Sequence, residues 1–269
     1  MKNNKLFFKL FLCLAMLLLA TDGFAQNSDA VPAEYSAFEH VAVLDSTKLD
    51  FDNLTIFPGY GLFVRENESG EYCALDSAKC PDFKHLKFLD NIWYDQVMAT
   101  DNHTFVRNGQ QVYDLGKDKC ELVVEFDSVD YRLFSANDTS FLVVNYQDDG
   151  CLLYRYSLSH GNAELLAATD ADIYGAEQFN DEVWFVAGNT LYKVTNNVIE
   201  SQLSYESEDF RGMILTPKGI LVYTSTKVAL FDGEQAYPIA TGDFYRLLYD
   251  SGRTYFVLRN GDVLATNAF

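Results

Sequence analysis

The sequence predicts an all-β fold: a six-bladed β-propeller of four-stranded antiparallel blades, with its ring closed by an N-terminal strand. The first observation is an aspartate followed closely by an aromatic residue, a pair that recurs at intervals of 34 to 42 residues. The second is a short apolar run centred 12 to 15 residues after each aspartate. A period in this range, kept over six repeats, is typical of supersecondary units that stack or close into a ring.

Both repeated features keep the same phase along the chain. The repeated aspartates are Asp50, Asp90, Asp130, Asp172, Asp209 and Asp243. The apolar runs are centred on Phe63, Phe105, Leu142, Phe185, Val222 and Phe256. A β-sandwich would not need so constant a period and a β-helix would have a shorter one, so the propeller is the preferred architecture.

Each repeat offers several short runs with strand-forming residues. In the second repeat these runs are residues 96–99, 104–107, 111–115 and 122–126, which are rich in Val, Phe and Tyr. Asn108-Gly109 lies between two of them, and Asn-Gly between apolar runs is a strong hairpin signal. The same pair returns in the last repeat at Asn260-Gly261. The fifth repeat has four comparable runs, at residues 213–215, 220–224, 228–232 and 237–240. No helical periodicity occurs outside the N-terminal leader.

The last repeat supports closure of the ring. It contains only three predicted strands, residues 245–248, 254–258 and 262–265. The missing outer strand is available at the other end of the chain, where residues 40–44 precede the first repeated aspartate. Pairing this segment with the last blade would remove an exposed strand edge.

Residues 1–25 have the pattern of a signal peptide. Lysines at positions 2, 5 and 9 precede an apolar stretch at residues 10–20, and Gly23-Phe24-Ala25 supplies the small residues of a cleavage site. The stretch is short for a membrane span, which needs about 20 residues; a retained anchor is the alternative. We therefore expect export to the periplasm, cell surface or medium, and a mature single domain of residues 26–269 with no other membrane span.

The charge balance limits the class of partner. The formal net charge is −19, and 48% of the residues are hydrophobic. Such a chain is globular, and its negative field repels phosphate backbones, which excludes nucleic acid as a partner. The same field is compatible with a cationic partner.

Cys73, Cys80, Cys120 and Cys151 follow the predicted cleavage site. An even number of cysteines in an exported chain indicates disulfides. The favoured pairing is Cys73–Cys80 with Cys120–Cys151, and four free thiols are the alternative. No clustered histidines accompany them, so we expect no metal site.

The repeated aspartates are the candidate binding residues. In a propeller they would lie near one rim of the central channel, and Arg132, Arg211 and Arg246 follow three of them. Six carboxylates around a rim could hold a cation or a basic peptide segment. Alternatively, each aspartate caps a turn through a backbone N–H while its aromatic neighbour packs between blades.

The pattern resembles the β-propeller superfamily over the whole mature chain. Residues 99–109, which read Ala-Thr-Asp-Asn-His-Thr-Phe-Val-Arg-Asn-Gly, are also similar to the repeat of the DKNYY family of exported bacterial proteins. The Asp, Asn and Asn-Gly positions match, while Phe105 and Val106 replace the paired tyrosines.

No known catalytic motif accompanies the repeats. The sequence lacks a Gly-x-Ser-x-Gly elbow and a Gly-x-x-x-x-Gly-Lys-Ser/Thr loop, and its histidines are scattered. We therefore predict a non-catalytic module, without a cofactor, that binds a protein, peptide or glycan through one rim. The alternatives are a carboxylate-based glycoside hydrolase or lyase at the channel mouth, and a structural component of an envelope assembly.

Overall fold

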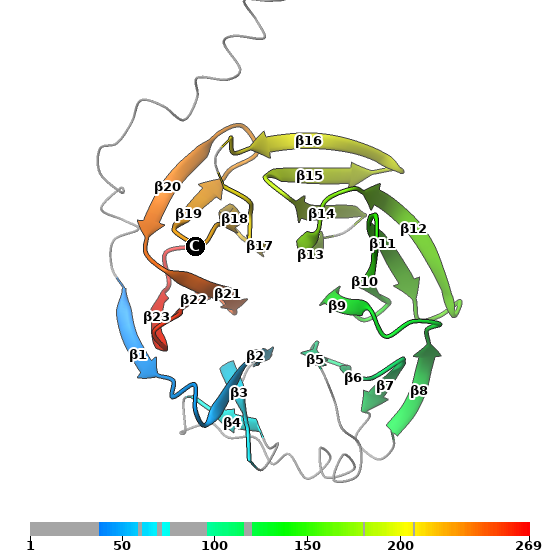
Figure 1. Cartoon of the computed structure of the whole chain (residues 1–269), viewed down its shortest axis with the longest axis horizontal. Coiled ribbons are helices and arrows are strands. Elements are labelled where there is room, and N and C mark those ends of the chain that lie inside the picture. The colour runs from blue at the N-terminus through cyan, green and yellow to red at the C-terminus, as the bar shows by residue number, and fades with distance from the viewer. Residues whose placement is uncertain are drawn as a thin grey trace, which may run out of the picture.

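Six small antiparallel sheets stand around a central axis in the computed structural model, as Figure 1 shows. The structure describes residues 38–58, 61–68, 72–75, 96–115, 120–179, 181–206 and 208–269. These residues form 23 strands and no helix, so none of them belongs to a helix that could cross a membrane. The predicted six-bladed propeller is confirmed.

The first three blades are built in chain order from the axis outward. Their strands are β2 (Leu49–Phe57), β3 (Gly61–Glu66) and β4 (Tyr72–Ala74); β5 (Gln96–Ala99), β6 (Thr104–Asn108), β7 (Gln111–Leu115) and β8 (Cys120–Glu125); and β9 (Tyr131–Ala136), β10 (Ser140–Gln147), β11 (Gly150–Ser157) and β12 (Asn162–Thr169). The fourth strand predicted for the first blade lies outside the described residues.

The last three blades follow the same order. Their strands are β13 (Ile173–Phe179), β14 (Glu182–Ala187), β15 (Thr190–Thr195) and β16 (Val198–Ser204); β17 (Gly212–Thr216), β18 (Gly219–Tyr223), β19 (Lys227–Phe231) and β20 (Ala236–Thr241); and β21 (Phe244–Asp250), β22 (Arg253–Leu258) and β23 (Asp262–Thr266). The outer strand of the sixth blade comes from the N-terminal side of the chain, as β1 (Glu39–Val43).

The predicted ring closure is confirmed by this last sheet. β1 pairs antiparallel with β23, and Glu39 faces Ala265 while Val43 faces Asp262. Leu44, directly after β1, is buried between the sixth and first blades. The two ends of the described chain therefore share one blade.

The second strand of each blade carries the core. The centres of the six predicted apolar runs lie on β3, β6, β10, β14, β18 and β22, and all six side chains have 0% exposure. Each of these strands is covered by a neighbouring blade on both faces. The sequence of each second strand is therefore a continuous apolar run, because neither face of the strand is in contact with water.

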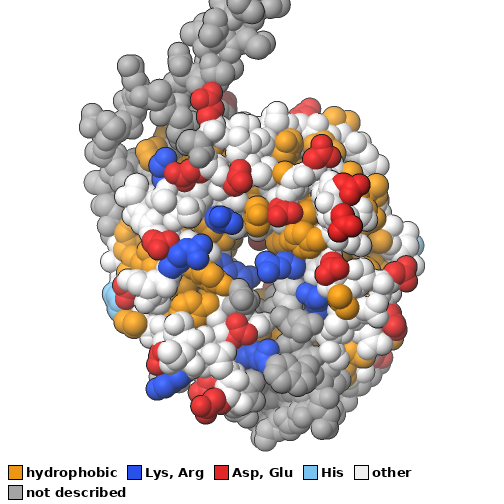
Figure 2. All heavy atoms as spheres, viewed as in Figure 1, with side chains coloured by type: hydrophobic (Ala, Val, Ile, Leu, Met, Phe, Trp, Pro, Cys, Tyr) orange, Lys and Arg blue, Asp and Glu red, His pale blue; other side chains and the backbone are white. Residues whose placement is uncertain are grey.

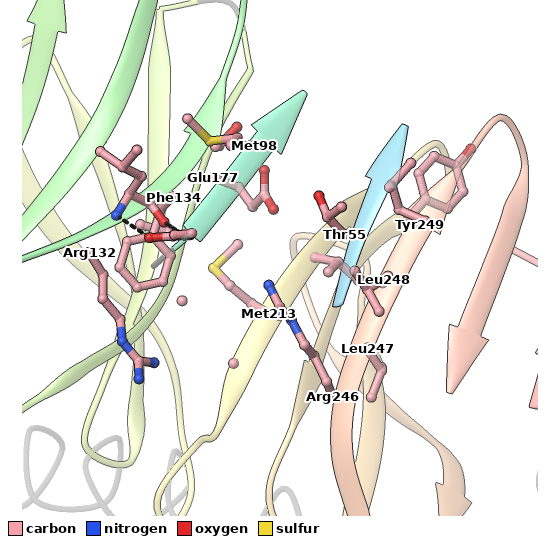
Figure 3. Close-up of a pocket in the computed structure, with 18 of the residues that line it drawn as sticks. Thr55, Met98, Arg132, Phe134, Glu177, Met213, Arg246, Leu247, Leu248 and Tyr249 are labelled. Carbon is pink, nitrogen blue, oxygen red and sulfur yellow. Dashed lines mark hydrogen bonds between the residues drawn. The ribbon is translucent and has the colours of Figure 1, made fainter. Parts of the chain in front are cut away.

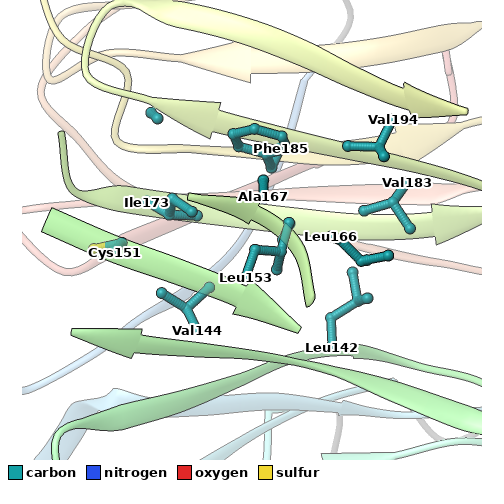
Figure 4. Close-up of a cluster of buried hydrophobic side chains, with 12 residues drawn as sticks. Leu142, Val144, Cys151, Leu153, Leu166, Ala167, Ile173, Val183, Phe185 and Val194 are labelled. Carbon is teal, nitrogen blue, oxygen red and sulfur yellow. The ribbon is translucent and has the colours of Figure 1, made fainter. Parts of the chain in front are cut away.

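Six clusters of buried apolar side chains separate the blades, one at each boundary. Figure 4 shows the cluster between the third and fourth blades, where Leu142 and Leu153 pack toward Phe185 and Val183. Burial of this apolar surface is the main driving force that holds adjacent blades together.

The predicted Asn-Gly turns form at the ends of second strands. In each, positive φ is confined to the glycine: Gly109 has φ of 56° and Gly261 of 92°. Both residues have positive φ in two other turns, Asn196-Asn197 between β15 and β16 and Ser251-Gly252 between β21 and β22.

The predicted Cys120–Cys151 disulfide is wrong. Both thiols are free. Cys120 packs against the cluster between the first and second blades, while Cys151 lies within the cluster between the third and fourth. Cys80 lies outside the described residues, and for Cys73 only the backbone, in β4, is described.

Deleting residues 36–48 should unfold the domain. The deletion removes β1 and Leu44, exposes the edge of β23 and uncovers one side of an inter-blade cluster. The expected loss is about 5 kcal/mol or more, which is comparable to the total stability of an ordinary domain. Circular dichroism melting should show no cooperative transition.

A chain lacking residues 26–35 serves as the matched control, because it keeps the whole of β1. A cooperative melt of the 36–48 deletion at the temperature of this control would contradict a closing role for β1.

Candidate functional site

A cavity of about 690 Å³ lies on the axis of the ring. Its wall comes mainly from the innermost strands β2, β5, β9, β13, β17 and β21, so every blade contributes to it. Figure 3 shows Thr55, Glu177 and Met213 pointing toward the same space from three different blades. A volume of this size is typical of small-molecule sites.

Arginines dominate the charged groups of the cavity. Those that line it are Arg107, Arg132, Arg211, Arg246 and Arg259, against the two carboxyl groups of Glu177 and Asp250 among the described residues. Figure 2 shows Lys and Arg side chains gathered around the central opening. A chain with a net charge of −19 therefore has a locally positive cavity.

Three of these arginines are held by neighbouring groups. Arg107 donates to the carbonyl of Val129 at 2.6 Å, and Arg246 donates to the carbonyl of Leu54 across the boundary between the sixth and first blades at 3.0 Å. Arg259 pairs with Asp243 at 3.1 Å. Their guanidinium groups are consequently fixed in place around the axis.

Arg132 and Arg211 are exposed at the opening and differ from these three. Within the described ranges, neither guanidinium forms an ion pair or a hydrogen bond. Arg211 instead lies over the ring of Tyr174, with 5.6 Å from its guanidinium carbon to the ring centroid. These two groups can bind an incoming anion without first losing a carboxylate partner.

β-Bulges direct two tyrosines into the same region. The register between β13 and β14 shifts between Ile173 and Gly175, and that between β21 and β22 shifts between Phe244 and Arg246. The extra residues are Tyr174 and Tyr245, and both line the cavity. A bulge re-aims the side chain of its extra residue, so these rings enter the cavity mouth beside the arginines.

Glu177 is the charged group of β13 inside the cavity. Burial raises its pKa to about 7, against the lowering effects of a hydrogen bond from Ser135 and the positive charge of Arg246. Figure 3 shows its carboxyl group in the interior, with Arg246 directed toward it from the opposite wall. A carboxyl group with this pKa carries its proton about half of the time at neutral pH.

The structure separates the predicted rim residues into two groups. Arg132, Arg211 and Arg246 line the cavity, whereas none of the five described aspartates of the repeat does so. Asp90 lies outside the described residues. The proposal that the aspartates form a binding ring stays a prediction.

The described aspartates take part in local contacts at the starts of the inner strands. In three blades the aspartate carbonyl accepts a backbone N–H from the end of the second strand or the loop after it: Tyr146 donates to Asp130, Gly188 to Asp172 and Arg259 to Asp243. Asp50 accepts a hydrogen bond from Asn53 at 2.7 Å. The carboxylate of Asp209 is exposed.

Arg107, Arg259 and Glu177 were not predicted as site residues. A signal for the two arginines exists, because each directly precedes an Asn-Gly turn, in Arg107-Asn108-Gly109 and Arg259-Asn260-Gly261. Glu177 has no such signal among the 39 acidic residues of the chain.

No three His, Cys, Asp or Glu side chains come together as possible metal ligands in the part of the chain that the structure describes. The expectation that the protein uses no cofactor is untested and stays a prediction.

Comparison with known proteins gives matches in structure alone. No family model and no curated protein matches the sequence. A candidate gluconolactonase is 10% identical with a TM-score of 0.57, over 88% of this chain and 93% of that one. A chain of a nidogen/laminin complex is 9% identical with a TM-score of 0.50, over 71% and 79%.

A further match comes from the extracellular domain of a candidate hybrid two-component system of B. thetaiotaomicron. It is 10% identical with a TM-score of 0.52, over 85% of this chain and 39% of that chain. The chain shares the β-propeller fold with these proteins. At these identities the propeller likeness shows the fold alone, and the resemblance to the DKNYY repeat stays a prediction.

Glu177→Gln should stabilise the propeller at high pH and leave its stability unchanged at low pH. The pKa of Glu177 is raised from 4.5 to about 7 on folding, so the folded state holds the proton more tightly. Native stability therefore falls as pH rises from about 4.5 to 7 and stays lower above pH 7. The variant should gain up to about 3 kcal/mol at pH 8 and almost nothing at pH 4.5.

Urea unfolding of both proteins at the two pH values measures this difference. Glu164→Gln is the matched control, since Glu164 is exposed on β12. Equal shifts for the two variants at pH 8 would show that net charge, and not the burial of Glu177, is responsible.

Proposed function

We propose that this protein is an exported, non-catalytic binding module and that its partner docks on the cavity mouth through an anionic group. The observation that carries the proposal is the exposed pair Arg132 and Arg211, which no described carboxylate neutralises, beside three further arginines on the cavity wall. Guanidinium groups bind carboxylates and phosphates through two parallel hydrogen bonds.

The local positive charge decides the sign of the ligand despite the net charge of the whole chain. Charges on the outer surface are screened over about 8 Å at physiological salt, whereas a cavity with low-dielectric walls focuses the field of the groups inside it. A cationic partner, which the net charge alone would allow, would have to dock elsewhere on the surface.

The non-repeated character of the cavity supports a binding role. The six inner strands share a structural position but present different side chains there, such as Thr55 on β2, Met98 on β5 and Glu177 on β13. A repeated residue generally serves the repeated structure, while residues that break the repeat are free to serve a ligand.

Export is part of the same proposal. It is supported by the leader pattern of residues 1–25 and by the likeness to the extracellular domain of a candidate hybrid two-component system of B. thetaiotaomicron. The partner would then be a protein, peptide or glycan met outside the cytoplasm.

Retention on charged resins tests the sign of the ligand. At 50 mM salt the mature protein should bind polygalacturonate or polyglutamate resin and should not bind polylysine resin through the cavity. Arg132→Gln with Arg211→Gln should weaken binding to the anionic resins at least about tenfold, because each charged hydrogen bond contributes about 1.5–3 kcal/mol.

The matched control is Arg155→Gln with Lys218→Gln, which removes the same charge from outside the cavity. Equal losses in the two double variants would show non-specific attraction. Binding to polylysine alone, unchanged by Arg132→Gln and Arg211→Gln, would contradict the proposed site.

The raised pKa of Glu177 supports a second candidate function, that of a carboxylate-based glycoside hydrolase or lyase. A general acid or base works best when its pKa lies near the working pH, and the pKa of Glu177 is about 7. In that case polygalacturonate should be cleaved, with release of reducing ends or of ultraviolet-absorbing unsaturated products. Glu177→Gln should slow this at least about a hundredfold; no product from the wild type would reject the enzyme.

A further inference from the structure

We propose that the central cavity binds a sugar acid, with its carboxylate on Arg132 and Arg211 and its hydroxyl groups toward Glu177, and that binding is accompanied by uptake of a proton at Glu177. This inference rests on the proposed function and adds to it the class of ligand and a dependence on pH.

The cavity is divided into zones of different chemistry. Arg132 and Arg211 are exposed at the opening. Met98, Phe134 and Met213 form apolar patches on the wall, and Ser135 donates a hydrogen bond to Glu177. Thr55 also lines the wall, and its hydroxyl group donates to the carbonyl of Val97 at 3.2 Å. Figure 3 places Arg132 at the end of the cavity away from Glu177, with Phe134 and Met213 between them.

A sugar acid fits this order of groups. The carboxylate matches the guanidinium groups, the C–H faces of a sugar ring match the apolar and aromatic walls, and the hydroxyl groups match Thr55, Ser135 and Glu177. Inorganic phosphate would leave most of a cavity of about 690 Å³ unfilled. An uncharged sugar would leave the two arginines without a counter-ion.

Among the described cavity residues, Glu177 is the group whose protonation should change when an anion binds near neutral pH. The other charged or titratable residues of the cavity are Tyr174 on β13 itself, Arg107 at β6, Arg132 at β9, Arg211 before β17, Tyr223 at β18, Tyr245, Arg246, Tyr249 and Asp250 at β21, and Arg259 after β22. β2 and β5 present no titratable described side chain to the cavity. Burial raises the pKa of Tyr174 and Tyr223, so both phenols stay neutral at pH 6–8.

A carboxylate that enters the cavity raises the free energy of ionised Glu177 by like-charge repulsion. It also covers the carboxyl group from water. Each effect favours the protonated acid, which can then donate a hydrogen bond to a ligand oxygen. By linkage, protonation of Glu177 must strengthen binding of the anion by the same factor.

Calorimetric titration of the mature protein with digalacturonate tests both parts. Affinity should fall about five- to tenfold between pH 6 and pH 8, because Glu177 ionises in the free protein over this range and stays protonated longer in the complex. Titrations at pH 7 in two buffers of different ionisation enthalpy should show uptake of about half a proton per ligand. Glu177→Gln should bind with a flat pH profile and no proton uptake.

Inorganic phosphate and the neutral disaccharide of galactose are the other probes. Digalacturonate binding that is absent in Arg132→Gln with Arg211→Gln, and present in Arg155→Gln with Lys218→Gln, supports the site. Equal affinity for phosphate, or for the neutral disaccharide, would overturn the sugar-acid assignment while leaving the resin result intact. Wild-type binding without proton uptake would overturn the role of Glu177, whatever the variants do.

Discussion

The structure depends on the fact that each blade has two apolar faces. On β3, Leu62 and Val64 pack against the sixth blade while Phe63 packs against the second, and all three side chains are at most 2% exposed. A sheet of this kind cannot cover itself, because alternate residues of its second strand project to opposite sides. Water is excluded only when another blade covers each face. Once the ring is closed, no blade has an apolar face exposed to solvent.

The inner strands contribute side chains both to the inter-blade clusters and to the cavity on the axis. The charged side chains that the inner strands present to the cavity belong to no inter-blade apolar cluster, so the repeat does not fix their identity. Arg132, Glu177 and Arg246 come from three blades and are far apart in the chain, yet they line one cavity. The ring thus brings a set of unrelated side chains together on a rigid frame.

The repeat made the fold predictable from sequence, since the same burial requirement acts at each blade. Phe105 and Phe256 were identified from an apolar run in constant phase, and both have no exposed surface. The closing strand was predictable from a count, because a blade with three strands needs a fourth. The Asn-Gly turns were found for the same reason, since a glycine with positive φ is a local requirement.

The cavity was only partly predictable, because its character arises from contacts between blades. Arg132, Arg211 and Arg246 were selected as neighbours of the repeated aspartates, and they do reach the cavity. Glu177 could not be selected, since its pKa depends on burial by other blades and on Arg246, which lies 69 residues away (246 − 177). The predicted Cys120–Cys151 pairing was wrong for a similar reason. An even number of cysteines does not show which inter-blade cluster contains each thiol.

The β1–β23 ladder has a mechanical consequence. Glu39 and Ala265 are partners in this ladder, so the two ends of the propeller emerge next to each other from the same edge. Tension applied between those ends would open the ladder like a zipper, one rung after another, instead of loading all rungs in shear. A pull of this kind would detach β1 and uncover β23. The propeller should therefore open at low force when it is stretched by its own termini.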